Sequence, residues 1–177
     1  MLLTSQKMKL RETLHRFVNT LASIFPGRSY LGKNKRTAPS SKILQTINCC
    51  TTLIIYSANS LLLVPALENA FFNESRDISR EHLLGSLQKL SLRRALQSQM
   101  IKSGKLIPWL VDTLAEPDNL SDYVLEYSAA LLMNLCLRTK GRYSLIGQAQ
   151  KTLRVLSDLL SFGFKFFLII FFQANRI

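Results

Sequence analysis

The chain has 177 residues, of which 47% are hydrophobic and 9% aromatic, which suits one folded domain and excludes wholesale disorder. Its formal net charge of +12 is unevenly distributed, because residues 1–60 carry nine Lys and Arg against one Glu, whereas residues 61–140 carry nine of each sign. A basic flank attracts nucleic acid, an acidic membrane surface or an acidic protein. The charge alone therefore does not decide among these partners.

The first predicted element is a helix, because apolar residues recur at steps of three and four, namely Leu10, Leu14, Phe17, Val18, Leu21 and Ile24. Pro26 and Gly27 predict its end, since Pro cannot continue the hydrogen-bond ladder and Gly accepts the left-handed conformation past a C-terminus. The next residues, "GRSYLGKN", have the glycine and lysine spacing of a phosphate-binding P-loop. A P-loop must leave a strand, however, so a preceding helix argues against a nucleotide hydrolase.

Residues 33–60 interrupt the helical pattern. They begin with the basic, polar stretch "KNKRTAPSSK", and the residues that follow lack a clean helix period. We therefore predict an irregular insert over 33–60.

Residues 97–137 predict three short helices within about forty residues. The first ends at Gly104, and the second has an apolar stripe over 106–114 that is stopped by Pro117. Ser121 or Asp122 can cap the third helix. This succession is typical of one unit of a helical solenoid.

A second copy of this unit lies upstream, over residues 61–92. Val64-Pro65-Ala66-Leu67 matches Ile107-Pro108-Trp109-Leu110 at a shift of 43 residues, and Gly85-Ser86-Leu87 matches Ala129-Ala130-Leu131 at a shift of 44. Residues 150–160 are similar to the start of a third copy. The period lies in the armadillo/HEAT range of roughly 40–47 residues.

The predicted fold class is an all-α, armadillo/HEAT-like helical solenoid of about two to three repeats with irregular flanks. The predicted parts are a helical segment resembling the end of a repeat (1–32), the basic and polar insert (33–60), the repeats (61–160) and an apolar C-terminal tail (161–177). At a shift of 114 residues, Gly27-Arg28 falls on Gly141-Arg142, which places both stretches just after the last helix of a repeat.

The chain resembles the armadillo-repeat family most clearly at residues 97–137. The matching positions are Gly104, Ile107, Pro108, Leu110, Val111, Leu114, Ala130, Leu131, Asn134 and Leu135. The resemblance extends to members that act at the centriole and ciliary basal body. It implies a protein-binding scaffold in cilium assembly and ciliary Hedgehog signalling, with ciliary or centriolar proteins as partners. The expected form is a truncated or variant version of a longer member, located in the cytoplasm.

Catalytic patterns are scarce in this sequence. His15 and His82 fall on predicted helices without a partner at triad or metal-ligand spacing, and packing or surface roles are favoured. The three Cys residues form no cluster with His at zinc spacing. We therefore expect no enzyme, no catalytic or metal-binding residues, no cofactor and no small-molecule substrate.

The candidate partner-binding residues are Lys89, Arg93, Glu126 and Asn134. In armadillo proteins that capture extended peptides, an Asn in each third helix binds the peptide backbone and a Trp one turn earlier forms a pocket. Asn134 matches the first position, but Ala130 stands where the Trp would be. A different protein contact through the four candidates is therefore favoured over recognition of nuclear-import signals.

The alternative to a scaffold is a basic peripheral binder of membrane or nucleic acid that uses residues 1–42 and the tail. Residues 162–172 are almost wholly apolar, yet they number only eleven and include Lys165, whereas a helical span needs roughly 20 residues. The tail is favoured as a cap on the last repeat, with membrane contact as the other interpretation.

Overall fold

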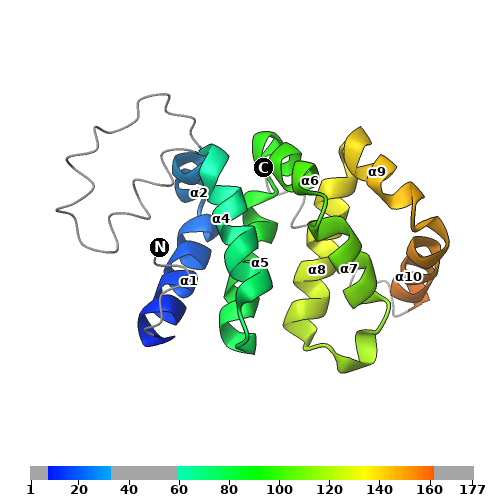
Figure 1. Ribbon diagram of the computed structural model, residues 1–177, viewed down its shortest axis with the longest axis horizontal. Coiled ribbons are helices and arrows are strands. Elements are labelled where there is room, and N and C mark those ends of the chain that lie inside the picture. The colour runs from blue at the N-terminus through cyan, green and yellow to red at the C-terminus, as the bar shows by residue number, and fades with distance from the viewer. Residues whose placement is uncertain (1–7, 33–59, 162–177) are drawn as a thin grey trace. The chain divides into compact units, whose positions relative to one another are not determined.

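The computed structural model describes residues 8–32 and 60–161, and every regular element in these ranges is helical (Figure 1). The chain divides into two compact units, of which unit 1 ends at Gln99 and unit 2 begins at Met100. The boundary falls inside α6 (Arg94–Ser103). The predicted all-α class is therefore confirmed for the described residues.

Unit 1 is built around α1 (Met8–Ser23) and α5 (Asp77–Leu90), which are far apart in the sequence but lie side by side (Figure 1). Helix α2 (Phe25–Leu31) follows α1 directly, and α4 (Ser60–Asn73) packs on α5. The core of unit 1 includes Leu14, Val18, Ala22, Leu31, Leu63, Val64, Leu67, Phe71, Leu83, Leu87 and Leu90. In α1, Leu14, Val18 and Ala22 lie on one buried helical face, whereas Phe17 and Ile24 of the predicted periodic set are exposed.

The helix predicted to end at Pro26-Gly27 ends at Ser23 instead, and Pro26 and Gly27 lie in the first turn of α2. Pro fits there because the first helical positions need no backbone donor. Gly27 permits a close approach, because an added Cβ would lie 2.0 Å from the carbonyl oxygen of Leu21. Its predicted role as a left-handed helix stop is wrong, since Gly104 is the only described Gly with a positive φ.

Arg28 stabilises the end of α1. Its Nη1 donates to the carbonyl oxygens of Ala22 at 3.0 Å and Ser23 at 2.8 Å. The last carbonyl groups of a helix lack intrahelical donors and carry partial negative charge, so a guanidinium is favourable there. The "GRSYLGKN" stretch therefore follows α1 and begins inside α2. No strand precedes Gly27 in the described range, and this excludes the P-loop interpretation.

A buried carboxylate joins α1 to the segment between α4 and α5. The Glu74 side chain is 1% exposed, and its Oε2 lies 2.9 Å from Arg11 Nε. Its Oε1 accepts from Arg11 Nη2 at 3.0 Å and from the backbone N–H groups of Ser75 at 3.1 Å and Arg76 at 3.2 Å. A buried charge is tolerated when it is paired and hydrogen-bonded in this way. Because Arg11 is 63 residues away, the pair fixes α1 to a distant part of the chain.

Unit 2 begins in α6, which ends at Ser103. Gly104 follows with a φ of +69°, a left-handed conformation that favours glycine. Helix α7 (Leu106–Leu114) then buries one face, formed by Leu106, Ile107, Leu110, Val111 and Leu114. The helix end predicted at Gly104 and the stripe predicted over 106–114 are both confirmed.

Helix α8 (Asp122–Cys136) follows the short 3₁₀ helix η1 (Pro117–Asn119). Ser121 caps its N-terminus, because Ser121 Oγ accepts a hydrogen bond from the backbone N–H of Val124 at 3.3 Å. Small residues on α8, at positions 128–130, are buried and allow close packing against α7. The predicted stop at Pro117 and one of the two predicted caps are thus confirmed.

The start of α9 (Thr139–Ile146) repeats the start of α2. A Cβ on Gly141 would lie 2.1 Å from the carbonyl oxygen of Leu135, and Arg142 Nη1 donates to the carbonyl oxygens of Cys136 at 3.1 Å and Leu137 at 3.4 Å. Gly27-Arg28 makes the same contacts 114 residues earlier. The predicted correspondence of the two Gly-Arg stretches is therefore confirmed in three dimensions.

The repeat spacing is close to the predicted period. The prolines inside α4 and α7 are 43 residues apart, as predicted, and the starts of α5 and α8, like those of α6 and α9, are 45 residues apart. Helix α10 (Ala149–Ser161) forms where the third copy was predicted to start. The predicted insert and tail lie outside the described residues, apart from Ser60 and Ser161, and stay predictions.

Candidate functional site

The candidate site of unit 1 is centred on Asn19 of α1. Asn19 Oδ1 accepts from Lys89 Nζ at 2.6 Å, and Asn19 Nδ2 faces His82 Nδ1 at 3.3 Å. An ammonium group can only donate, so the amide oxygen must face Lys89 and the NH₂ group must face the ring. His82 Nδ1 therefore accepts the hydrogen bond, which assigns the neutral ring with its proton on Nε2.

Two arginines extend this site beyond α5. Arg93 lies in the connection between α5 and α6, and its Nη1 donates to Ser29 Oγ of α2 at 2.7 Å. The same side chain passes close to Gly32, because a Cβ on Gly32 would lie 3.1 Å from Arg93 Nε. Arg28 of α2 lies against the end of α1. We call Arg28, Lys89 and Arg93 the basic cluster.

The three cations of the basic cluster repel one another. Burial lowers the pKa of Lys89 below its ordinary value, and the positive charge of Arg28 lowers this pKa further. Burial also lowers the pKa of Arg28, with repulsion from Arg93 as the second cause. Arg28 is therefore near enough to both other side chains for their charges to interact.

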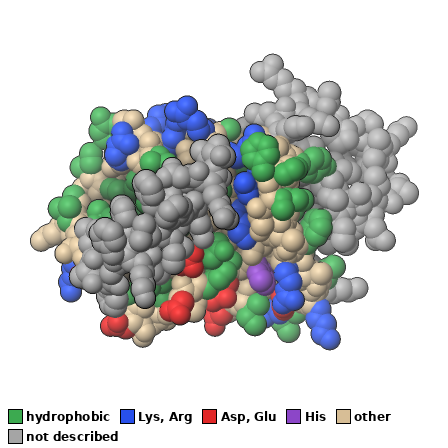
Figure 2. All heavy atoms as spheres, turned by 180° about the vertical axis from the view of Figure 1, so that it is seen from behind, with side chains coloured by type: hydrophobic (Ala, Val, Ile, Leu, Met, Phe, Trp, Pro, Cys, Tyr) green, Lys and Arg blue, Asp and Glu red, His purple; other side chains and the backbone are tan. Residues whose placement is uncertain are grey.

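Charge is separated along unit 1. On the face drawn in Figure 2, Lys and Arg side chains form a column above a histidine side chain. His82 and Lys89 are two turns apart on the same face of α5. The paired carboxylates Glu12 and Glu74, by contrast, belong to the first half of α1 and to the segment that precedes α5. The region where α1 and α5 end is thus locally basic.

Replacing His82 by Gln tests whether this ring is neutral in the folded protein. Burial is the main cause that lowers the pKa of His82 below 6.5; Arg16 and Lys89 lower it further, whereas Glu12 and Glu81 raise it. The unfolded chain therefore binds this proton more readily than the folded chain. The stabilising contribution of neutral His82 is complete above pH 6.5 and is lost as the pH falls through the lower folded pKa.

Urea unfolding of the wild type and His82→Gln, compared at pH values on both sides of 6.5, measures this contribution. We expect the stability of the wild type relative to His82→Gln to decrease as the solution becomes acidic, because Gln does not titrate. His15 is present in both proteins, so its own titration cancels in the difference. A stability difference that is the same at every pH would contradict the neutral ring.

The predicted residues of unit 2 both lie on α8, eight residues apart. Asn134 is 3% exposed, whereas Glu126 is half-buried. Burial raises the pKa of Tyr127, and the negative charge of Glu126 raises it further. Tyr127 stacks on Tyr123 with their ring centroids 4.1 Å apart. The burial of Asn134 argues against its use as an exposed peptide-binding amide.

The structure places the four predicted residues in two units, with Lys89 and Arg93 in unit 1 and Glu126 and Asn134 in unit 2. Their role in binding stays a prediction. Sequence reasoning did not identify Asn19 or Arg28 as part of the site. A signal was present for Asn19, because it is a polar residue beside Val18 and Ala22 on the buried face of α1, which also holds His15.

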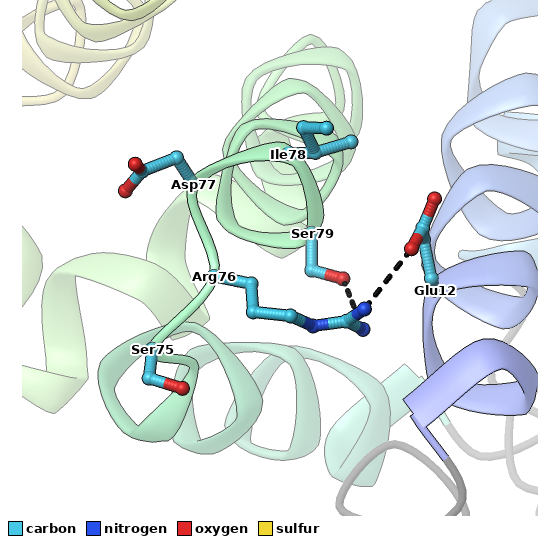
Figure 3. Close-up of a pocket in the computed structure, with 6 residues that line it drawn as sticks. All are labelled: Glu12, Ser75, Arg76, Asp77, Ile78 and Ser79. Atoms are coloured by element: carbon cyan, nitrogen blue, oxygen red, sulfur yellow. Dashed lines mark hydrogen bonds and ion pairs between the residues drawn. The ribbon is translucent and has the colours of Figure 1, made fainter.

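A pocket of about 330 Å³ opens at the start of α5 (Figure 3). It is lined by Glu12, Ser75, Arg76, Asp77, Ile78 and Ser79. Arg76 crosses it, with Nη1 3.1 Å from Glu12 Oε2 and Nη2 donating to Ser79 Oγ at 3.1 Å. A guanidinium cannot act as a general base, so this contact does not activate the Ser79 hydroxyl. The Arg76–Glu12 pair in this pocket links α1 to the start of α5. The pocket contains no arrangement for catalysis by Ser79.

Within residues 8–32 and 60–161, no three side chains of the metal-ligating types His, Cys, Asp and Glu are grouped so that they could hold a metal ion. His15 is fully buried beside Glu74, with its Nδ1 3.8 Å from Glu74 Oε2, which is consistent with the predicted packing role. Among the helices of the described part of the chain, none combines the length and the apolar character needed to cross a bilayer.

Comparison with known proteins supports the armadillo resemblance. The family described as "LisH domain-containing protein ARMC9, ARM repeats" matches residues 100–166. LisH domain-containing protein ARMC9 of Rattus norvegicus is 46% identical over 160 residues, and that of Homo sapiens is 45% identical over 160 residues, each covering 90% of this chain. The Xenopus laevis protein is 51% identical over 118 residues, or 64% of the chain.

The chain spans less than a fifth of the length of these relatives, namely 18% of the rat protein, 16% of the human protein and 14% of the Xenopus laevis protein. No solved structure matches the chain significantly. The similarity thus confirms the armadillo-repeat resemblance and the all-α solenoid class, which were predicted from the sequence.

Proposed function

We propose that the chain is a non-enzymatic scaffold for protein–protein interaction, because residues 100–166 match the armadillo-repeat family model of ARMC9 proteins. We further propose that it acts in the cytoplasm at the centriole and ciliary basal body, in cilium assembly and ciliary Hedgehog signalling. Its proposed partners are proteins of these structures. The ciliary part of the proposal rests on the family resemblance.

The observation that carries the scaffold proposal is the surface where α1 and α5 end. Polar and charged side chains from four segments meet there, and Asn19, Ser29 and their partners hold them in fixed positions. Fixed polar groups on the surface of packed helices suit recognition of another protein, because little side-chain order is lost on binding. The pocket at the start of α5 in unit 1, by contrast, holds no arrangement that would activate Ser79 for catalysis.

Proximity labelling of the full chain in ciliated cells tests the cellular part of the proposal. The chain is fused to a biotin ligase, and the ligase alone is the control. We expect centrosomal and basal-body proteins to be labelled more strongly by the fusion than by the control. Equal labelling of these proteins by the fusion and the control would contradict a ciliary role.

The net charge of +12 favours a second candidate function, which is peripheral binding to a membrane or to nucleic acid through basic residues. Salt dependence separates the two functions, because binding to phosphates weakens steeply as the ionic strength rises. For a scaffold, we expect the neighbours found by labelling to stay bound in cell lysates at moderate salt. Their release together with bulk nucleic acid or lipid would favour the second candidate.

A further inference from the structure

The basic cluster is held together although its charges repel. Arg28 comes from α2, Lys89 from α5 and Arg93 from the connection between α5 and α6. Hydrogen bonds to Ala22, Ser23, Asn19 and Ser29 fix the three side chains, and all of these acceptors are uncharged. The fold therefore concentrates positive charge at a defined place.

The acidic side chains of unit 1 do not neutralise the two arginines. Among the described residues, neither Arg28 nor Arg93 takes part in an ion pair. Glu12 and Glu74 are instead engaged by arginines near the start of α1 and α5. A bound anion would relieve the repulsion within the basic cluster and would be attracted by it.

We propose that the basic cluster binds carboxylate side chains of an acidic segment in a partner protein. This inference rests on the proposed scaffold function and names the chemistry of the partner. Arg28 and Arg93 can each direct planar N–H groups toward a carboxylate, and Lys89 adds a compact positive charge. Ser29, which already positions Arg93, is half-buried and adds a hydroxyl group that can reach a peptide backbone.

The shape and surroundings of the basic cluster favour a peptide over a membrane or a duplex. All three cations are half-buried rather than projecting into solvent. A bilayer or a duplex contacts protruding side chains over a broad surface, whereas a flexible chain can place single carboxylates against partly buried cations. Glu12 and Glu81 also lie close enough to His82 to influence its pKa, so a continuous row of phosphates along α5 would meet negative charge.

Fluorescence anisotropy of a labelled peptide of alternating Glu and Gly residues tests the proposal on the full chain. The main variant is Lys89→Gln with Arg93→Gln. Arg28 is retained because it also stabilises the end of α1. We expect the double variant to bind about tenfold or more weakly, because it loses two charge-assisted contacts. The single variant Arg93→Gln, whose hydrogen bond is to Ser29 alone, should show part of the same loss.

Lys9→Gln is the matched control for the single variant Arg93→Gln, because it removes the same single charge but lies ten residues before Asn19 on α1, about 15 Å along the helix. We expect it to bind the peptide as the wild type does. The charge-preserving variant Lys89→Arg with Arg93→Lys should restore most of the affinity. Far-UV circular dichroism shows whether each variant is folded, and Arg93→Gln serves as the test if the double variant is not.

Two results would overturn the proposal. One is equal weakening by Lys9→Gln and Arg93→Gln, which would show a general charge effect rather than a site. The other is tighter, cluster-dependent binding to vesicles containing phosphatidylserine or to a DNA duplex than to the peptide. Binding of the purified chain is measured without reference to its cellular location, so this test can succeed or fail independently of the labelling experiment.

Discussion

Replacing Glu74 by Ala is expected to lower the free energy of unfolding by about 3–5 kcal/mol, the usual cost of breaking a buried ion pair. The variant leaves the Arg11 guanidinium, which is 19% exposed, without its carboxylate. It also removes the acceptor of the backbone N–H groups of Ser75 and Arg76. Urea unfolding followed by circular dichroism measures the loss.

Glu12→Ala is the matched control, because Glu12 and its partner Arg76 are each about 30% exposed. A pair exposed to this extent contributes roughly 0–1 kcal/mol. Glu74→Gln should fall between the two variants, since its amide oxygen can still accept from the backbone. If Glu74→Ala were no more destabilising than Glu12→Ala, the buried pair would not be what fixes α1 to the segment before α5.

Replacing Gly141 by Ala is expected to destabilise unit 2 by roughly 3 kcal/mol, the upper end of the usual cost of overpacking. The new Cβ would lie 2.1 Å from the carbonyl oxygen of Leu135 and 2.8 Å from its carbonyl carbon. These are backbone atoms, so a rotamer change cannot relieve the contact and α9 must move away from the end of α8. Thermal and urea unfolding measure the effect.

Gly147→Ala provides the control for the same substitution in the same unit. A Cβ there would meet no atom within 4 Å, and the residue has a φ of −63°, which Ala adopts without strain. We expect Gly147→Ala to leave stability unchanged or to raise it by about 0.4–1 kcal/mol through the unfolded state. Equal effects of the two substitutions would show that α9 does not require the close approach at Gly141.

Helix positions in unit 2 could be predicted because their signals are local. The stripe over 106–114, the glycine at 104 and the proline at 117 act within one or two turns of where they stand. Gly27 shows where such reasoning fails. A glycine can end a helix, or it can permit two backbone segments to touch. Which role Gly27 has depends on how α2 packs against the backbone of Leu21.

The candidate site was predicted in part for the same reason. Lys89 and Arg93 were identified from their own segment, but Asn19 and Arg28 come from α1 and α2, more than sixty residues earlier. No periodicity within one helix reports which distant helix will lie beside it. The burial of Asn134 was missed because the predicted stripe of α8 did not include it, although buried residues lie on both sides of it in the sequence.

The repeated Gly-Arg pair has a consequence for finding repeats in longer relatives. In both cases the glycine stands six residues after a leucine whose carbonyl oxygen it contacts, and the arginine beside it donates to the next two carbonyl groups. Both contacts are made with the backbone, so they do not depend on which apolar residues fill the core. Core residues can therefore drift during evolution while the pair keeps its function. A glycine and an arginine at this distance from a leucine near the end of the preceding helix should locate the joints between repeats in sequences where the hydrophobic spacing is too weak to follow.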